Sequence, residues 1–185
     1  MNLFLIVYIS WGLSEVFLNR FVRSGKTDKQ AADNHTELYL WVTIVLSIIA
    51  GSYAAMKINL PIFFNIQYSY IGIGLMIGGI IFRFVAIRQL GRFFTVDVTI
   101  RQDHELTQSG LYKYLRHPSY SGALLTFFGF GLSLNNWVSL FVVLLPVIFT
   151  FILRINHEEK VLTQQFGKQY TDYIRRTKRM IPFIY

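Results

Sequence analysis

Two polar clusters in an otherwise apolar sequence contain the residue types that could do chemistry. The first runs from Arg116 to Gly122 with the sequence Arg-His-Pro-Ser-Tyr-Ser-Gly, and the second runs from Arg154 to Glu159 with the sequence Arg-Ile-Asn-His-Glu-Glu. Arg, His and carboxylate groups can bind a charged ligand and orient it. On a helix, Arg154 and Glu158 would share a face, whereas Glu159 would be turned about 100° away. We therefore expect the two carboxylates to have different partners.

The first cluster also predicts where a helix begins. Pro118 suits the first position of a helix, where its missing N–H costs nothing and its fixed φ helps. A helix N-terminus is a favourable place for an anionic group such as a carboxylate. Tyr120 and Gly122 would lie in the first turns, where a glycine permits close approach of a ligand or of a neighbouring helix. The sequence alone leaves both possibilities open.

The composition indicates a membrane protein. Of the 185 residues, 53% are hydrophobic and 15% are charged, against about 25% charged residues in ordinary soluble domains. The chain has no cysteine, so disulfides, thiolate nucleophiles and cysteine metal sites are excluded. Disordered, collagen-like and disulfide-scaffold classes are excluded too.

Five apolar stretches are long enough to be membrane spans, which need about 17 to 25 residues each. The last two are joined only by Asn135-Asn136, which predicts a tight turn between antiparallel helices. We therefore predict an all-α polytopic membrane helix bundle of about five transmembrane helices, in a single domain covering residues 1–185. The expected spans are residues 2–19, 38–56, 62–87, 118–134 and 137–153.

The basic residues predict the orientation of this bundle. Seventeen of the 18 Lys and Arg residues fall between the first two spans, from Arg83 to Arg116, or from Arg154 onward, and only Lys57 falls on the opposite side. By the positive-inside rule, the N-terminus is outside and the C-terminus is cytoplasmic. The net charge of +8 then belongs to loops and does not indicate nucleic-acid binding. The same topology brings both polar clusters to the cytoplasmic end, where we expect a functional site.

Other polar segments give weaker signals. Apolar and polar residues alternate over 95–101, which predicts a short strand. One helical face of the tail is apolar, which predicts an amphipathic helix lying at the membrane interface; its residues are Leu162, Phe166, Tyr170, Tyr173 and Ile174.

Charged residues inside the predicted spans and two isolated histidines are further candidates for a role. Glu15 is expected to reach the interface or pair with Arg20, and Arg83 could face the bundle and bind an anionic substrate. His35 and His104 lack partners at metal-ligand spacing, so we predict no metal.

The order of these motifs resembles the isoprenylcysteine carboxyl methyltransferase family, including its short prokaryotic members. The resemblance covers residues 90–182, with the motifs in 90–122 and 154–182. It includes Gly-x-Tyr at 110–112, Arg-His-Pro-x-Tyr-x-Gly at 116–122, Arg-x-x-x-Glu-Glu at 154–159, Phe-Gly-x-x-Tyr-x-x-Tyr at 166–173 and Thr-x-Arg-x-x-Pro at 177–182. It implies a helical membrane bundle that binds S-adenosylmethionine at its cytoplasmic end and methylates a carboxylate.

The resemblance also implies roles for individual residues. Arg154 and Glu158 are the expected catalytic residues. The expected contacts to the substrate carboxylate follow from guanidinium chemistry and not from the resemblance, with Arg154 as the first candidate and Arg83 as the second. The residues expected to bind S-adenosylmethionine are Leu111, Tyr112, His117, Pro118, Tyr120, Gly122, Glu158 and Glu159.

The expected partners are membrane lipids and a lipophilic methyl acceptor that enters from the bilayer. The expected location is a bacterial or archaeal cell membrane, or the endoplasmic reticulum in a eukaryote. Three alternatives stay open: a phospholipid or amine N-methyltransferase, an NADPH-dependent membrane reductase of the sterol type, and a non-catalytic membrane scaffold.

Overall fold

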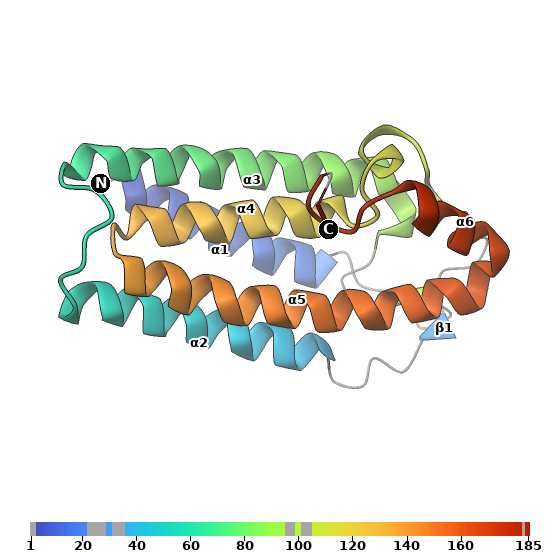
Figure 1. Cartoon of the computed structure of the whole chain (residues 1–185), viewed down its shortest axis with the longest axis horizontal. Coiled ribbons are helices and arrows are strands. Elements are labelled where there is room, and N and C mark those ends of the chain that lie inside the picture. Colours follow the sequence, from blue (N-terminus) through green and yellow to red (C-terminus); the bar gives the residue numbers. More distant parts are fainter. Residues whose placement is uncertain (1–2, 22–28, 31–35, 95–98, 101–104, 183) are drawn as a thin grey trace.

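Long antiparallel helices make up most of the molecule (Figure 1). The computed structural model describes the whole chain except residues 1–2, 22–28, 31–35, 95–98, 101–104 and 183. The five long helices are α1 (Leu3–Phe21), α2 (Thr36–Lys57), α3 (Ser69–Leu90), α4 (Pro118–Ser133) and α5 (Trp137–Phe166). The short elements are α6 (Lys168–Arg176), the 3-10 helices η1 (Ile66–Tyr68), η2 (Gly91–Phe93) and η3 (Gly110–Lys113), and the antiparallel strands β1 (Lys29–Gln30) and β2 (Thr99–Ile100).

The predicted all-α membrane bundle is confirmed, and one of its helices begins later than predicted. The third helix begins at Ser69 and not at residue 62, because Asn65 caps the short helix η1 ahead of it. Helix α5 extends beyond the expected span 137–153 to Phe166, so it includes the second polar cluster. By length and apolar composition, Thr36–Lys57, Ile66–Phe93 and Trp137–Phe166 can cross a membrane, and Leu3–Leu18 is a shorter apolar helix. The number of spans and their orientation remain predictions.

Helices α3 and α4 pack unusually closely because glycines lie between them. A Cβ atom added at Gly72 would lie 2.5 Å from the carbonyl oxygen of Gly129, and one added at Gly79 would lie 2.6 Å from the backbone nitrogen of Thr126. Small residues allow helix backbones to approach in this way inside membranes. By contrast, nothing lies within 4 Å of a Cβ added at Gly74.

The predicted tight turn joins α4 to α5. Asn135 has φ +49°, a conformation that asparagine tolerates, and the Asn136 side chain caps α5 by accepting from the Ser139 N–H. The Asn135 side chain also accepts from the N–H of Phe63 at 2.8 Å. The turn therefore lies at the same end of the bundle as the segment before η1.

The tail differs from the sequence prediction in two respects. It is not one helix, because Gly167, with φ +52°, ends α5 and turns the chain into α6. Part of its apolar face also packs against the protein, since Tyr170 and Tyr173 are buried. Of the strand predicted over 95–101, only β2 at Thr99–Ile100 falls within the described residues, and it is a strand.

Candidate active site

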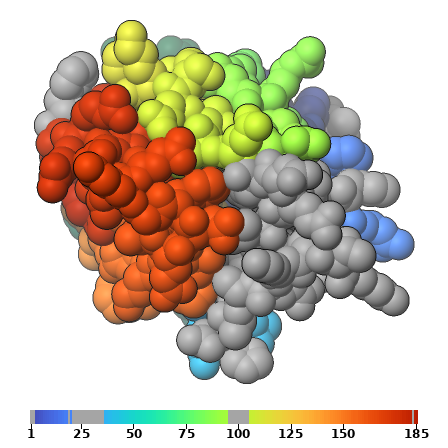
Figure 2. Space-filling view, turned by 90° about the vertical axis from the view of Figure 1, so that its right-hand side faces the viewer, coloured from blue at the N-terminus to red at the C-terminus, as the bar shows by residue number. Residues whose placement is uncertain are grey.

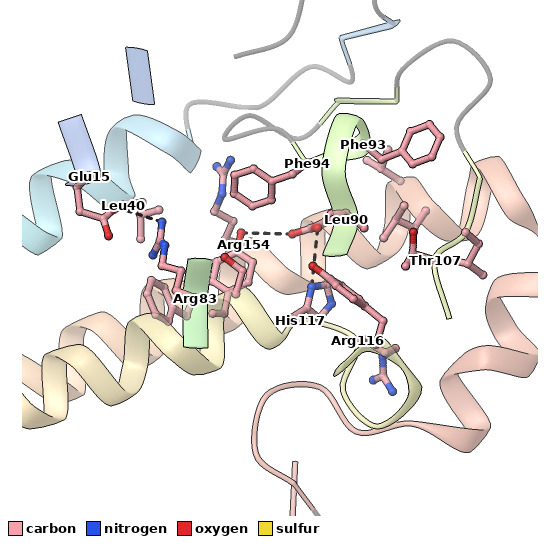
Figure 3. Close-up of a pocket in the computed structure, with 18 of the residues that line it drawn as sticks. Glu15, Leu40, Arg83, Leu90, Phe93, Phe94, Thr107, Arg116, His117 and Arg154 are labelled. Carbon is pink, nitrogen blue, oxygen red and sulfur yellow. Dashed lines mark hydrogen bonds and ion pairs between the residues drawn. The ribbon is translucent and has the colours of Figure 1, made fainter. Parts of the chain in front are cut away.

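The α4–α5 hairpin brings the two polar clusters together. Pro118 is in the first turn of α4, as predicted, and His117 is the N-cap residue, with its side chain not used for capping. His117 is 4% exposed and faces the carboxylates of α5. Figure 3 shows His117 and Arg116 beside the polar groups of this end of the cavity.

Glu158 and Glu159 share His117 as a neighbour but otherwise have different partners. Glu158 accepts from the Tyr120 hydroxyl at 3.2 Å. Glu159 lies 2.7 Å from Nε of Arg116, 2.8 Å from Nη2 of Arg179 and 3.3 Å from Nε2 of His117. The Glu159 carboxylate is thus surrounded by two cations and a histidine, while the Glu158 carboxylate remains partly accessible.

A large cavity begins at these groups and extends into the bundle. It is lined by side chains from α1 to α6 and from the loop before η3. Six of the residues expected from the sequence line it: Arg83, Tyr112, His117, Tyr120, Arg154 and Glu158.

Four other expected residues do not line the cavity, and each has a structural partner. Gly122 contacts α3, because a Cβ there would lie 2.6 Å from the backbone nitrogen of Arg83. Of the two possibilities left open, the close approach is therefore that of a helix. The Leu111 N–H donates to Oε1 of Gln89 at 2.8 Å. Pro118 is fully buried in the first turn of α4, and Glu159 is enclosed by its cations.

Charged residues also reach the inner part of the cavity. Glu15 pairs with Arg83 at 3.1 Å (Figure 3), and not with Arg20 as one sequence-based alternative suggested. Arg154 is 2% exposed and donates to Oγ1 of Thr36 at 2.9 Å. Charges at this depth are costly unless they are paired or functional.

Part of the cavity wall could not be identified from the sequence. Leu106 and Thr107 come from the loop before η3, and Trp11 and Trp41 come from α1 and α2, where no motif was recognised. Tyr170 and Tyr173 from α6 also line the cavity. These two tyrosines belong to the motif at 166–173, but the apolar pattern around them predicts a helix at the membrane interface and not a cavity wall.

The tyrosines at the polar end remain protonated. Burial is the main cause that raises the pKa of Tyr112, Tyr170 and Tyr173 well above the usual range. For Tyr170, the nearby carboxylates of Glu159 and Glu158 raise the pKa further. These hydroxyls are therefore neutral hydrogen-bond donors at physiological pH.

A C-terminal strap, residues 177–182, holds the start of α4 in place. The backbone N–H groups of Arg116 and His117 donate to the carbonyls of Lys178 and Arg179, at 2.8 and 2.9 Å. The Ser121 hydroxyl donates to the carbonyl of Met180 at 2.5 Å. The strap thus fixes the backbone on which His117 is mounted.

The two histidines considered for a metal site, His35 and His104, lie outside the described residues. Within the described residues, no group of three His, Cys, Asp or Glu side chains is arranged to hold a metal ion.

Comparison with known proteins places these features in context. The sequence profile of a family described as phospholipid methyltransferase matches residues 68–169. An Arabidopsis thaliana protein named protein-S-isoprenylcysteine O-methyltransferase B is 39% identical over 118 residues, which cover 63% of this chain and 60% of the relative. A Saccharomyces cerevisiae protein-S-isoprenylcysteine O-methyltransferase is 36% identical over 122 residues, which cover 62% of this chain and 48% of the relative.

The fold also matches a solved structure. The structure described as the eukaryotic intramembrane Ras methyltransferase ICMT superposes with a TM-score of 0.68 and 26% sequence identity, covering 98% of this chain and 65% of that protein. The chain therefore spans less than two thirds of these relatives.

Proposed function

The chain belongs to the phospholipid methyltransferase family, and from this premise we propose that it transfers a methyl group from S-adenosylmethionine to the carboxylate of a lipophilic, isoprenylcysteine-like acceptor. The observation that carries the proposal is that polar and apolar side chains line the same cavity. Glu158 and His117 belong to its polar part, and Trp11 and Ile44 belong to its apolar part.

The residues at the polar end fit the methyl donor. The rings of Tyr112, Tyr170 and Tyr173 give this end of the cavity an aromatic wall against which a purine can pack, and their hydroxyls are neutral. Glu158 is an accessible carboxylate that can accept from ribose hydroxyls or attract a positive group. When bound, S-adenosylmethionine supplies an electrophilic methyl group on a sulfonium ion.

The chain's contribution to the reaction is to hold the acceptor in line and to exclude water. Alignment of two reactants is the main requirement for such a displacement. Combining a carboxylate with a sulfonium removes charge, so a dry site favours the transfer. A carboxylate acceptor is already nucleophilic and needs no general base.

Arg154 is the residue best placed to bind the acceptor carboxylate. It is buried in the cavity wall and is four residues from Glu158 on the same helix. A guanidinium can bind a carboxylate through two parallel hydrogen bonds. The other candidate, Arg83, already has its charge balanced by Glu15.

The packing of the helices supports entry of the acceptor from the bilayer. Helix α1 packs on α3 and helix α2 packs on α5, so the apolar end of the cavity lies between helices of different pairs. The residues there include Trp11 from α1 and Leu40 and Ile44 from α2. An acceptor with a long apolar chain would pass between α1 and α2.

The decisive test is transfer of a radiolabelled methyl group from S-adenosylmethionine into membrane extracts, followed by mild alkali. A methyl ester releases volatile methanol, and this is the expected result. Label that survives alkali in the lipid fraction would indicate amine N-methylation instead. Absence of transfer together with stabilisation by NADPH would indicate a reductase. Membranes containing the Arg154→Ala variant supply the background.

A further inference from the structure

Tyr170 is a buried polar residue at the polar end of the cavity. It lies on α6, is 1% exposed, and lines the cavity. Its hydroxyl is buried and has no hydrogen-bond partner among the described residues. A buried hydroxyl without a partner costs free energy that a ligand can recover.

The other tyrosines of the cavity wall differ in this respect. The Tyr173 hydroxyl donates to the carbonyl of Tyr112 at 2.6 Å. The Tyr120 hydroxyl donates to Glu158, and the Tyr112 hydroxyl donates to the carbonyl of Ala86 at 3.4 Å. Tyr170 is thus the lining tyrosine whose donor is left for a ligand.

The surroundings of Tyr170 indicate what kind of acceptor it would meet. Its ring lies 6.0 Å from that of Tyr173, tilted by 59°, and the adjoining wall includes Leu106 and Leu162. This wall suits a flat heterocycle. Burial is the main cause that raises the pKa of Tyr170, and the carboxylates of Glu159 and Glu158 raise it further. They also make the position unfavourable for a further carboxylate, so a neutral acceptor atom is favoured.

We propose that the Tyr170 hydroxyl donates a hydrogen bond to the nucleoside part of the bound methyl donor, which makes α6 part of the ligand site. The proposal rests on the proposed function. Figure 2 shows the C-terminal residues, in red, adjoining the segment that contains η3, in yellow, on this end of the molecule. A ligand held between these segments would join α6 to the start of α4.

The test is a titration of the detergent-purified full chain with S-adenosylhomocysteine and with 5′-methylthioadenosine, which has the nucleoside but no amino acid. For Tyr170→Phe we expect Kd to rise about tenfold for both compounds, because one hydrogen bond is lost. Its Tm without ligand should be equal to or above that of the wild type, since an unpartnered hydroxyl is removed.

Tyr173→Phe is the matched control, because its hydroxyl is used within the protein. It should lower the Tm without ligand, the opposite of the effect expected at Tyr170. Equal Kd values for wild type and Tyr170→Phe would overturn the inference alone. A loss for S-adenosylhomocysteine but not for 5′-methylthioadenosine would overturn the assignment to the nucleoside. A wild-type chain that binds neither compound would overturn the proposed function as well.

Discussion

Glu158 and Glu159 are adjacent in the sequence, yet one carboxylate accepts from Tyr120 and the other is bound by Arg116. The difference arises because an α-helix rotates by about 100° from one residue to the next, so adjacent side chains point in different directions. It separates a carboxylate that is available to a ligand from one that holds the site together. The two positions should therefore respond differently to the same substitution.

Glu159→Gln should destabilise the protein, because it leaves Arg116 and Arg179 without their charge partner. Removing one member of a buried ion pair typically costs about 3–5 kcal/mol. Glu158→Gln should instead leave the Tm nearly unchanged and weaken binding of S-adenosylhomocysteine. Thermal unfolding and ligand titration of both variants measure this. Equal Tm values for the two variants would contradict the separation of roles.

Arg154→Lys should reduce turnover by about 10- to 100-fold, the equivalent of one charged hydrogen bond, while Kd for S-adenosylhomocysteine stays near the wild-type value. Lysine cannot reproduce the two parallel hydrogen bonds of a guanidinium. Steady-state kinetics measure the loss of turnover, and titration with S-adenosylhomocysteine measures Kd. Arg175→Lys is the control, because Arg175 is exposed. A parallel loss of donor binding in Arg154→Lys would place Arg154 in the donor site.

Gly72→Ala should destabilise the bundle, since the added Cβ would lie 2.5 Å from the Gly129 carbonyl oxygen. Gly74→Ala is the control on the same helix, and it has open space around it. Alanine is favoured over glycine in a helix by about 1 kcal/mol, so the control should be neutral or stabilising. Thermal unfolding in detergent measures both variants. An unchanged Tm for Gly72→Ala would show that α3 and α4 can separate to make room for the added methyl group.

The orientation of the bundle is testable with single cysteines, since the chain has none of its own. Phe64 is fully exposed and lies next to Phe63, which is bonded to the α4–α5 turn. An impermeant thiol reagent should label Phe64→Cys in intact cells and Lys26→Cys only after permeabilisation. The reverse pattern would overturn the predicted topology.

A chain ended after Thr177 should lose S-adenosylhomocysteine binding, because the N–H groups of Arg116 and His117 lose their acceptors in the strap. Lys178→Ala is the control, because the strap bonds through its backbone at this position. Titration of both proteins with S-adenosylhomocysteine measures the effect. Unchanged binding by the shortened chain would show that the start of α4 keeps its structure without the strap.

The parts of the site that follow from local helix geometry could be predicted from the sequence. The Asn135-Asn136 turn, the position of Pro118 and the divergence of Glu158 from Glu159 all depend on residues close together in the chain. The helices of the bundle could be predicted from hydropathy, which also depends on neighbouring residues. Hydropathy could not show where α5 ends, because its last turns are polar.

The remaining features depend on contacts between distant segments. Nothing in the sequence distinguishes Arg83 from Arg20 as the partner of Glu15, because the choice depends on how α1 lies against α3. The apolar face of α6 has the same pattern whether it faces lipid or protein, so the burial of Tyr170 could not be predicted. Only the packed structure separates these alternatives.

The strap has a consequence for the order in which the molecule is made. The acceptors for the N–H groups of Arg116 and His117 belong to Lys178 and Arg179, which the ribosome adds only after the whole of α5 and α6. When α4 first reaches the membrane, its N-terminal turn therefore lacks these partners. The polar end of the cavity is therefore completed late in biosynthesis, after the apolar helices that precede the strap have been made.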